Sequence, residues 1–117
     1  MPVGFTTPYH THHREDECFY VVDGNVAFVC NGEWLEAGPG AFVYGPRDIA
    51  HGFKAIGERP VRMLLMCTPA GFERFVLDQA TRLMVPPPDM ARLMLLAERH
   101  GIEIHGPLPE APARFAR

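Results

Sequence analysis

Two histidines and a glutamate near the start of the chain have the types and the spacing of metal ligands. His10 and His12 lie two residues apart, and Glu17 begins an apolar run that ends at Gly24. Residues two apart in an extended strand point to the same face, so we expect the two imidazoles to face one point. First-row transition metals accept imidazole nitrogen and carboxylate oxygen as ligands. This stretch therefore predicts part of a metal site, and the rest of the chain must supply a further ligand and enclose it.

Composition narrows the classes of function. The 117 residues suffice for one hydrophobic core, and the hydrophobic content of 47% with 21% charged residues is typical of a globular protein. The net charge of -3, with basic residues scattered singly, argues against a nucleic-acid surface. No apolar segment has the length of a membrane span, and the first residues do not resemble a signal peptide. We therefore expect neither nucleic acid nor a membrane as a partner.

The three cysteines indicate the compartment. Cys18, Cys30 and Cys67 lie singly in apolar runs and have no Cys-x-x-Cys spacing. Such cysteines behave as small hydrophobic residues, and an odd number does not suggest a disulfide framework. We therefore expect a cytoplasmic protein.

Short apolar segments separated by Gly and Pro turns predict an all-β sandwich or barrel. Residues 1–9 contain two prolines and a glycine, which favour an extended lead-in. Turn residues at 23–25 and 31–32 predict two successive hairpins, hence a meander. The strands are expected from Glu17 to residue 22, at 26–30, 33–36 and 41–44, from near His51, and at 61–68.

After residue 68 the pattern becomes helical. The apolar spacing predicts a helix from about 70 to 83, and residues 86–88 form a proline linker. Asp89 is expected to cap a second helix over 90–100, which Gly101 ends. Residues 102–104 are strand-like, and we expect 107–117 to be loose. We divide the chain into a barrel at 1–68 and a C-terminal helical extension at 69–117 that packs on the barrel.

Two longer motifs resemble the signatures of the cupin superfamily. The first is His10-x-His12-x4-Glu17-x6-Gly24 and the second is Gly40-x5-Pro46-x-Asp48-x2-His51, and together they cover about residues 8–55. Residues 68–75 resemble a subgroup of small single-domain cupins that is labelled quercetin-dioxygenase-like, a label that does not establish a substrate. The resemblance implies a cupin jelly-roll β-barrel, here followed by two C-terminal α-helices, with a metal inside the barrel.

The resemblance also implies the ligand set. His10, His12 and Glu17 would come from the first motif and His51 from the second. The residues agree, because His51 is the first residue after the turn at 45–48 that can face inward. Such a set leaves coordination positions open, as catalysis requires. We expect a divalent transition metal: Fe(II) or Mn suits the carboxylate and the open positions best, and Zn, Ni or Cu is chemically allowed.

The chain departs from the family pattern in three places. Asp48 stands where the second motif usually has Gly, and Ala55 stands where it usually has Asn. Only nine residues precede His10, where family members commonly carry one or two further barrel strands. The N-terminal strands of the barrel are therefore expected to be missing here or to lie upstream of Met1. A sheet edge would then be open, and we expect a second copy of the chain to cover it in a homodimer.

The sequence also predicts where several other side chains lie relative to the site and the barrel. His13 is expected to point away from the site, and Asp16 to face outward, where it can pair with Arg14. Phe72 and Phe75 are expected either to close the mouth of the barrel or to pack as an ordinary helix face. The side chains expected to line the barrel are Phe19, Phe28, Phe42, Phe53, Met63 and Leu65. The candidate groups at its rim are Tyr44, Arg47, Lys54 and Trp34.

The leading functional hypothesis is a metal-dependent enzyme that acts on a small aromatic or enol-type molecule, with dioxygenase-like chemistry favoured. Glu17 would act as a ligand and, when displaced, as a general base for the substrate's acidic proton. Isomerase and cyclase chemistry share that first step and stay open as redox-neutral alternatives. A non-enzymatic module that binds a metal or small ligand is an alternative of a different class, and a storage-type barrel with a vestigial site is a third.

Overall fold

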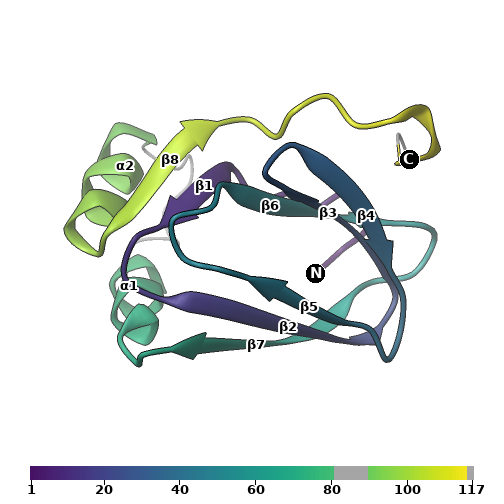
Figure 1. The fold of residues 1–117 in the computed structure, drawn as a ribbon, viewed down its shortest axis with the longest axis horizontal. Coiled ribbons are helices and arrows are strands. Elements are labelled where there is room, and N and C mark those ends of the chain that lie inside the picture. Colours follow the sequence, from purple (N-terminus) through teal and green to yellow (C-terminus); the bar gives the residue numbers. More distant parts are fainter. Residues whose placement is uncertain (81–89, 116–117) are drawn as a thin grey trace.

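Two antiparallel β-sheets face each other, and two helices lie at one end of them (Figure 1). The computed structural model describes residues 1–80 and 90–115. One sheet has the strand order β4-β3-β6-β1-β8 and the other β5-β2-β7. The strands are β1 (Tyr9–His12), β2 (Asp16–Asp23), β3 (Asn25–Cys30), β4 (Glu33–Ala37), β5 (Phe42–Gly45), β6 (His51–Ile56), β7 (Arg62–Thr68) and β8 (Ile102–Gly106). The jelly-roll with two helices is confirmed.

The prediction of two successive hairpins is wrong for the first turn, at residues 23–25. Strands β2 and β3 belong to different sheets, so the chain crosses between the sheets at Gly24. Gly24 has φ +82, and a Cβ there would lie 2.6 Å from the carbonyl oxygen of Pro60, so only glycine fits this crossing. The second predicted turn does form a hairpin: Asn31 and Gly32 both have positive φ, and β3 pairs with β4 on either side of them.

The main core lies between the two sheets. Along β2, Phe19 and Val21 point inward and are almost fully buried, whereas Tyr20 points outward. Four of the six expected lining residues, Phe19, Phe28, Phe53 and Met63, belong to this core. The expectation for Phe42 is wrong, because it pairs with Tyr20 and shares its outer face. Leu65 faces inward opposite Phe19 but remains 39% exposed, since β7 is a sheet edge.

The first residues of the chain cover part of the sheet edge that we expected to be open. The Gly4 N–H donates to the Ala55 carbonyl at 2.9 Å, and the Ala55 N–H donates to the Phe5 carbonyl at 2.8 Å. Farther back, the Val61 N–H donates to the Met1 carbonyl at 2.8 Å. Residues 1–7 therefore run beside β6 and reach the start of β7. They continue along β6 the pairing that β1 makes with its first residues.

The C-terminal half begins with α1 (Phe72–Ala80) and α2 (Met90–Arg99). The first helix thus begins two residues later than expected, and Gly101, with φ +73, follows the second as predicted. The expected proline linker and Asp89 lie outside the described residues. Strand β8 then pairs with β1. Phe75, Ala97 and Ile102 form a buried cluster that holds both helices against this strand.

The expectation that the tail is loose is wrong for residues 107–115. This segment runs across the outer face of the five-stranded sheet (Figure 1) and ends in a 3-10 turn, Ala113–Phe115. Phe115 is 2% exposed, packs against Ala27 and Ile56, and stacks with Trp34 at a ring distance of 6.0 Å. The outward face of β3 and β6 is apolar here, so the tail removes it from water.

Candidate metal centre

The two sheets bring His10, His12, Glu17 and His51 together at the end of the barrel next to α1. His10 and His51 are register partners on the adjacent strands β1 and β6, and His12 lies on the same face of β1. Glu17 reaches them from β2 in the facing sheet. Each residue offers one ligand atom, and these four atoms lie within 4.8 Å of one another. The cluster is the complete set that the two sequence motifs predict.

Backbone carbonyls fix the orientation of two imidazoles. The Nδ1–H of His10 donates to the Pro8 carbonyl at 2.7 Å, and the Nδ1–H of His51 donates to the Ile49 carbonyl at 3.1 Å. A carbonyl can only accept, so the proton must sit on Nδ1 in both rings. Nε2 is therefore the ring atom that is free to bind a metal in both histidines, and both Nε2 atoms lie toward the Glu17 carboxylate.

A carboxylate that the sequence reasoning missed fixes the third imidazole. The Nδ1–H of His12 donates to Glu15 Oε1 at 2.6 Å, and Glu15 is only 4% exposed. A carboxylate behind a histidine sets its tautomer and increases its basicity as a ligand. The only signal in the sequence was that Glu15 follows His12 by three residues. It stands in a run of charged residues, and such a run is usually exposed to solvent.

The charges in the cluster are strongly coupled. Burial lowers the pKa of His10 to about 4, so that ring is neutral. Burial also opposes the charge on Glu17, but hydrogen bonds from His12 and His51 outweigh it and lower the pKa of Glu17 to about 2. Despite burial, Glu17 and Glu15 together raise the pKa of His12. The Glu17 carboxylate is thus ionised, and the Nε2 atoms of His51 and His10 lie 3.1 Å and 3.9 Å from its Oε1.

This donor set fits a divalent transition metal. With Nδ1 committed to its anchor in each ring, the three Nε2 atoms and the Glu17 oxygen converge on one buried spot. These atoms can lie so close only with a cation between them: either protons, as in the hydrogen bonds from His12 and His51 to Glu17, or a metal ion, to which all four would present lone pairs. Three nitrogens and one oxygen are an accepted ligand set for iron, manganese, nickel, copper or zinc, and they leave positions open.

Aromatic rings enclose the cluster. The Phe72 ring on α1 lies 5.2 Å from the His12 ring, and the Phe19 ring lies 6.2 Å from that of His51. Phe75 instead belongs to the buried cluster that joins α1 and α2. Of the two residues expected at the mouth, Phe72 therefore covers the site, while Phe75 packs the helix.

The residues around the cluster mostly behave as expected. His13 points away: it is half exposed, and its two ring nitrogens contact Asp48 at 2.7 Å and Glu103 at 3.1 Å. Asp16 faces outward but pairs with Arg47 rather than Arg14, because Arg47 supplies both its backbone N–H at 2.8 Å and its guanidinium at 3.3 Å.

The two substitutions in the second motif have different effects. Asp48 adopts φ +67, the left-handed conformation that glycine usually supplies, and its N–H donates to the His12 carbonyl at 2.8 Å. The turn that precedes His51 is therefore kept. Ala55 is fully buried in the core between the sheets, so its methyl group packs there and does not reach the rim.

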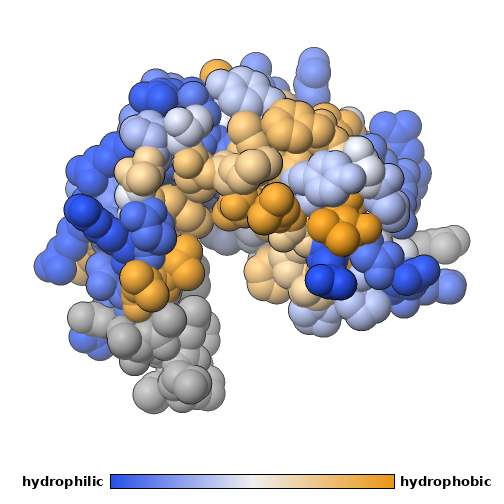
Figure 2. All heavy atoms as spheres, turned by 90° about the horizontal axis from the view of Figure 1, so that it is seen from below, coloured by the Kyte–Doolittle hydropathy of each residue, from blue (hydrophilic) through white to orange (hydrophobic). Residues whose placement is uncertain are grey.

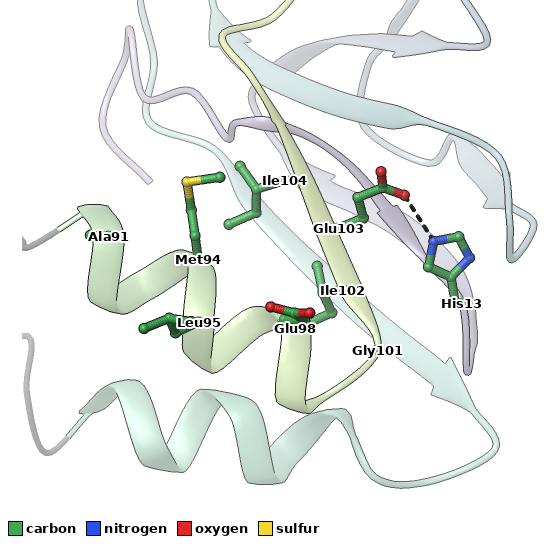
Figure 3. A pocket seen from close by; sticks show the side chains of 9 residues that line it. All are labelled: His13, Ala91, Met94, Leu95, Glu98, Gly101, Ile102, Glu103 and Ile104. Atoms are coloured by element: carbon green, nitrogen blue, oxygen red, sulfur yellow. Dashed lines mark hydrogen bonds and ion pairs between the residues drawn. The ribbon is translucent and has the colours of Figure 1, made fainter.

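A surface groove lies apart from the cluster, between α2 and β8 (Figure 3). It has a volume of about 560 Å³ and is lined by Met94, Leu95, Glu98, Glu103 and Ile104, among others. None of the four clustered residues lines it. The groove is therefore separate from the cluster.

Comparison with known proteins supports the fold and the motif pair. A family model described as the Cupin domain matches residues 1–67, more than half of the chain, and the chain belongs to this family. An uncharacterized protein of Methanocaldococcus jannaschii is 29% identical over 69 residues, which cover 59% of this chain and 55% of that protein.

Two solved structures are similar as well. KdgF from a Halomonas species has 26% identity and a TM-score of 0.57, with 63% of this chain and 66% of that chain covered. A protein from Acidithiobacillus ferrooxidans, provisionally named a sugar phosphate isomerase, has 29% identity and a TM-score of 0.54, with 57% and 44% covered. The chain thus spans only 44% to 66% of the length of these relatives. Within the described residues, no helix is long and apolar enough to cross a membrane.

Proposed function

We propose that this cupin is a metal-dependent enzyme that acts on a small organic molecule. The observation that carries the proposal is the convergence of three anchored imidazoles and one carboxylate on a single buried spot. His10, His12, His51 and Glu17 would hold the metal, with Fe(II) or Mn favoured. When bound, the metal would supply Lewis acidity to a substrate hydroxyl or carbonyl oxygen.

Glu17 has two roles in this proposal, and its environment separates them. As long as it is hydrogen-bonded to His12 and His51, its pKa of about 2 makes it a good anionic ligand and a very weak base. Its basicity rises only when the carboxylate leaves these partners. Glu17 would therefore accept a substrate proton only after substrate has displaced it from the cluster.

The surrounding side chains favour a partly apolar substrate. Phe72 and Phe19 pack against the rings of His12 and His51, and Phe53 lies beside Phe19 at a ring distance of 5.8 Å. These rings exclude water from the cluster and leave few polar groups to orient a substrate. An aromatic or enol-type molecule would satisfy such a site, with one oxygen on the metal side and an acidic proton near Glu17.

Two reaction classes follow from the same proton transfer. Dioxygenase-like chemistry is the hypothesis that the sequence favours. Redox-neutral isomerisation is the second candidate, and the likeness to the provisionally named sugar phosphate isomerase supports it. A non-enzymatic binding module has the same ligand set but would show no turnover with either class of substrate.

The test is turnover by protein loaded anaerobically with Fe(II) or Mn. Flavonols, catechols and 1,3-diketones would be followed by oxygen uptake, and hydroxy-aldehydes and ketoses by NMR for oxygen-independent isomerisation. We expect turnover in one class, loss of it in His51→Ala, and full retention in the control Leu95→Ala, since Leu95 is 62% exposed on α2 and lies apart from the cluster. A metal-loaded protein that turns over none of these compounds would contradict the enzymatic proposal.

A further inference from the structure

A second pocket, of about 420 Å³, lies at the end of the molecule that carries the two helices. Three connections of the chain form it: the loop between β1 and β2, the segment between β7 and α1, and the end of α2. Its charged and titratable lining residues are Arg14, Glu15, Arg74, Arg99 and His100. We call it the arginine pocket. In Figure 2 the atoms at this end of the molecule, on the left, are mostly hydrophilic.

The arginine pocket is positively charged, although the chain as a whole has a net charge of -3. Among the described residues, Glu15 is the only acid that lines it, so three guanidinium groups face one carboxylate and leave an excess of two positive charges. The Glu15 Oε1 already accepts from the His12 Nδ1–H at 2.6 Å. His100 has a partner outside the pocket, because its Nε2 lies 3.1 Å from Asp78 Oδ2.

The three guanidinium groups have no counter-ion among residues 1–80 and 90–115. Arg47 shows the usual arrangement on this protein, because its guanidinium pairs with Asp16 at 3.3 Å. Within those residues, no such ion pair or hydrogen bond holds Arg14, Arg74 or Arg99. Their donors are therefore available to an anion in the pocket.

Gly101 fixes the position of Arg14. A Cβ on Gly101 would lie 2.7 Å from the Cγ and 2.8 Å from the Nε of Arg14, so the arginine side chain lies directly against this glycine. The Gly101 carbonyl also accepts the His13 N–H at 2.8 Å, which ties the loop between β1 and β2 to the end of α2. A side chain that is already held in place loses less conformational entropy when a ligand binds.

The start of α1 places Arg74 where a bound anion would stabilise it. Arg74 lies in the first turn of the helix, where the helix dipole disfavours a positive charge. The Gly71 N–H there already donates to Glu73 Oε2 at 2.8 Å. The guanidinium groups, rather than the end of the helix, would therefore supply the positive charge that an anion meets.

We propose that the arginine pocket binds a phosphate group, either free or carried by a small organic molecule. The fork of guanidinium donors matches the oxygens of a phosphate and can bind them in pairs. A phosphate monoester carries close to two negative charges at neutral pH, which matches the excess of two positive charges in the pocket. The volume of about 420 Å³ lies in the range of small-molecule sites, so the pocket has room for an organic part.

The phosphate would not be a ligand of the metal. Glu15 holds the Nδ1 side of the His12 ring, whereas the Nε2 side of the same ring faces Glu17. None of the four clustered residues lines the arginine pocket. The proposal is therefore independent of the metal-dependent function, and either can fail without the other.

The test is an NMR titration of the full chain in a low-salt buffer near neutral pH with inorganic phosphate, glycerol 3-phosphate and glycerol. We expect both phosphates to bind with dissociation constants of at most about 1 mM and to shift the amide signals of Gly71, His100 and Gly101. Glycerol should cause no shifts. Tighter binding of glycerol 3-phosphate would assign the site to a phosphorylated small molecule, and tighter binding of inorganic phosphate would assign it to the free anion.

Arg74→Gln and Arg99→Gln, both at exposed positions, should each weaken phosphate binding by about 10- to 100-fold, because each removes charge-assisted hydrogen bonds. The matched control is Arg62→Gln, which makes the same change of charge at the far end of β7, roughly 20 Å from Thr68. It should keep the affinity of the wild type, and so should His51→Ala.

Three results would overturn the proposal. The first is that neither phosphate binds at about 10 mM. The second is that Arg62→Gln weakens binding as much as Arg74→Gln and Arg99→Gln, which would mean that only the overall charge attracts the anion. The third is that His51→Ala abolishes binding while the two pocket variants keep it, because the phosphate would then bind at the metal centre.

Discussion

At the scale of single residues, the most informative contact is the one between Glu15 and His12. Each of the three imidazoles has its outer nitrogen held by an acceptor, but only His12 is held by a charged one. A carboxylate in this position makes the facing nitrogen a stronger ligand, and it costs desolvation that is offset when a cation occupies the centre. Glu15 therefore acts as a positioning residue for the cluster.

We predict that Glu15→Ala weakens metal binding by about 10- to 100-fold, as expected for loss of an outer partner of a ligand. Glu15→Gln should lie between Ala and wild type, because its amide oxygen can still accept from the His12 Nδ1–H but carries no charge. Titration calorimetry under anaerobic conditions measures both. Glu103→Ala is the control, since Glu103 is an exposed carboxylate that contacts His13 outside the site. Equal affinity of Glu15→Ala and wild type would refute this role.

At the scale of elements, the turn before β6 and the C-terminal segment hold the strands that carry the metal ligands in place. The turn before β6 uses Asp48 in a left-handed conformation and ties its N–H to the His12 carbonyl. The C-terminal segment covers the outer side of β3 and β6 through Phe115. Both contacts join segments that are far apart in the sequence, and both support the strands that carry His12 and His51.

Comparing Asp48→Gly with Asp48→Val isolates the backbone requirement of the turn. Both variants lose the carboxylate that contacts His13, but only valine must hold a β-branched side chain at φ +67. We expect Asp48→Val to be less stable than Asp48→Gly by about 1–3 kcal/mol. Urea unfolding measures the difference. If the two variants unfold at the same urea concentration, the turn does not require this conformation.

Phe115→Ala tests whether the tail contributes to the fold. Removing a ring that is 2% exposed should lower the free energy of unfolding by about 3–5 kcal/mol. Leu95→Ala, on the exposed side of α2, should change it by no more than about 0.5 kcal/mol. Chemical denaturation of both variants makes the comparison. A Phe115→Ala effect as small as that of Leu95→Ala would mean that the tail is only loosely attached.

At the scale of the whole molecule, the sequence predicted what depends on local spacing. The strand periods predicted an all-β sandwich or barrel, and the resemblance of the two motifs to the cupin signatures implied the jelly-roll and the convergence of His10, His12, Glu17 and His51. They were not enough for the crossing at Gly24, because a tight turn looks the same whether the next strand joins the same sheet or the facing one. The packing of Phe115 depends on a face of β3 and β6 that only the assembled sheet creates.

Metal should also stabilise the whole chain, because the four ligands are brought together only by folding. At a free metal concentration about 100 times the dissociation constant, the expected gain in the free energy of unfolding is about 2.7 kcal/mol. Thermal unfolding with and without Mn(II) measures it. His51→Ala should lose the gain, and the surface variant Leu95→Ala on α2 should keep it. Equal gains in both variants would place the metal elsewhere on the protein.

The most direct test of the central claim is the metal stoichiometry of the purified protein after anaerobic loading with Fe(II), Mn(II), Ni(II) or Zn(II) and desalting. Inductively coupled plasma mass spectrometry should find about one metal ion per chain in the wild type, and almost none in a double variant of His51→Ala with Glu17→Ala. A wild type that retains none of these metals would contradict the account, as would a double variant that retains as much metal as the wild type.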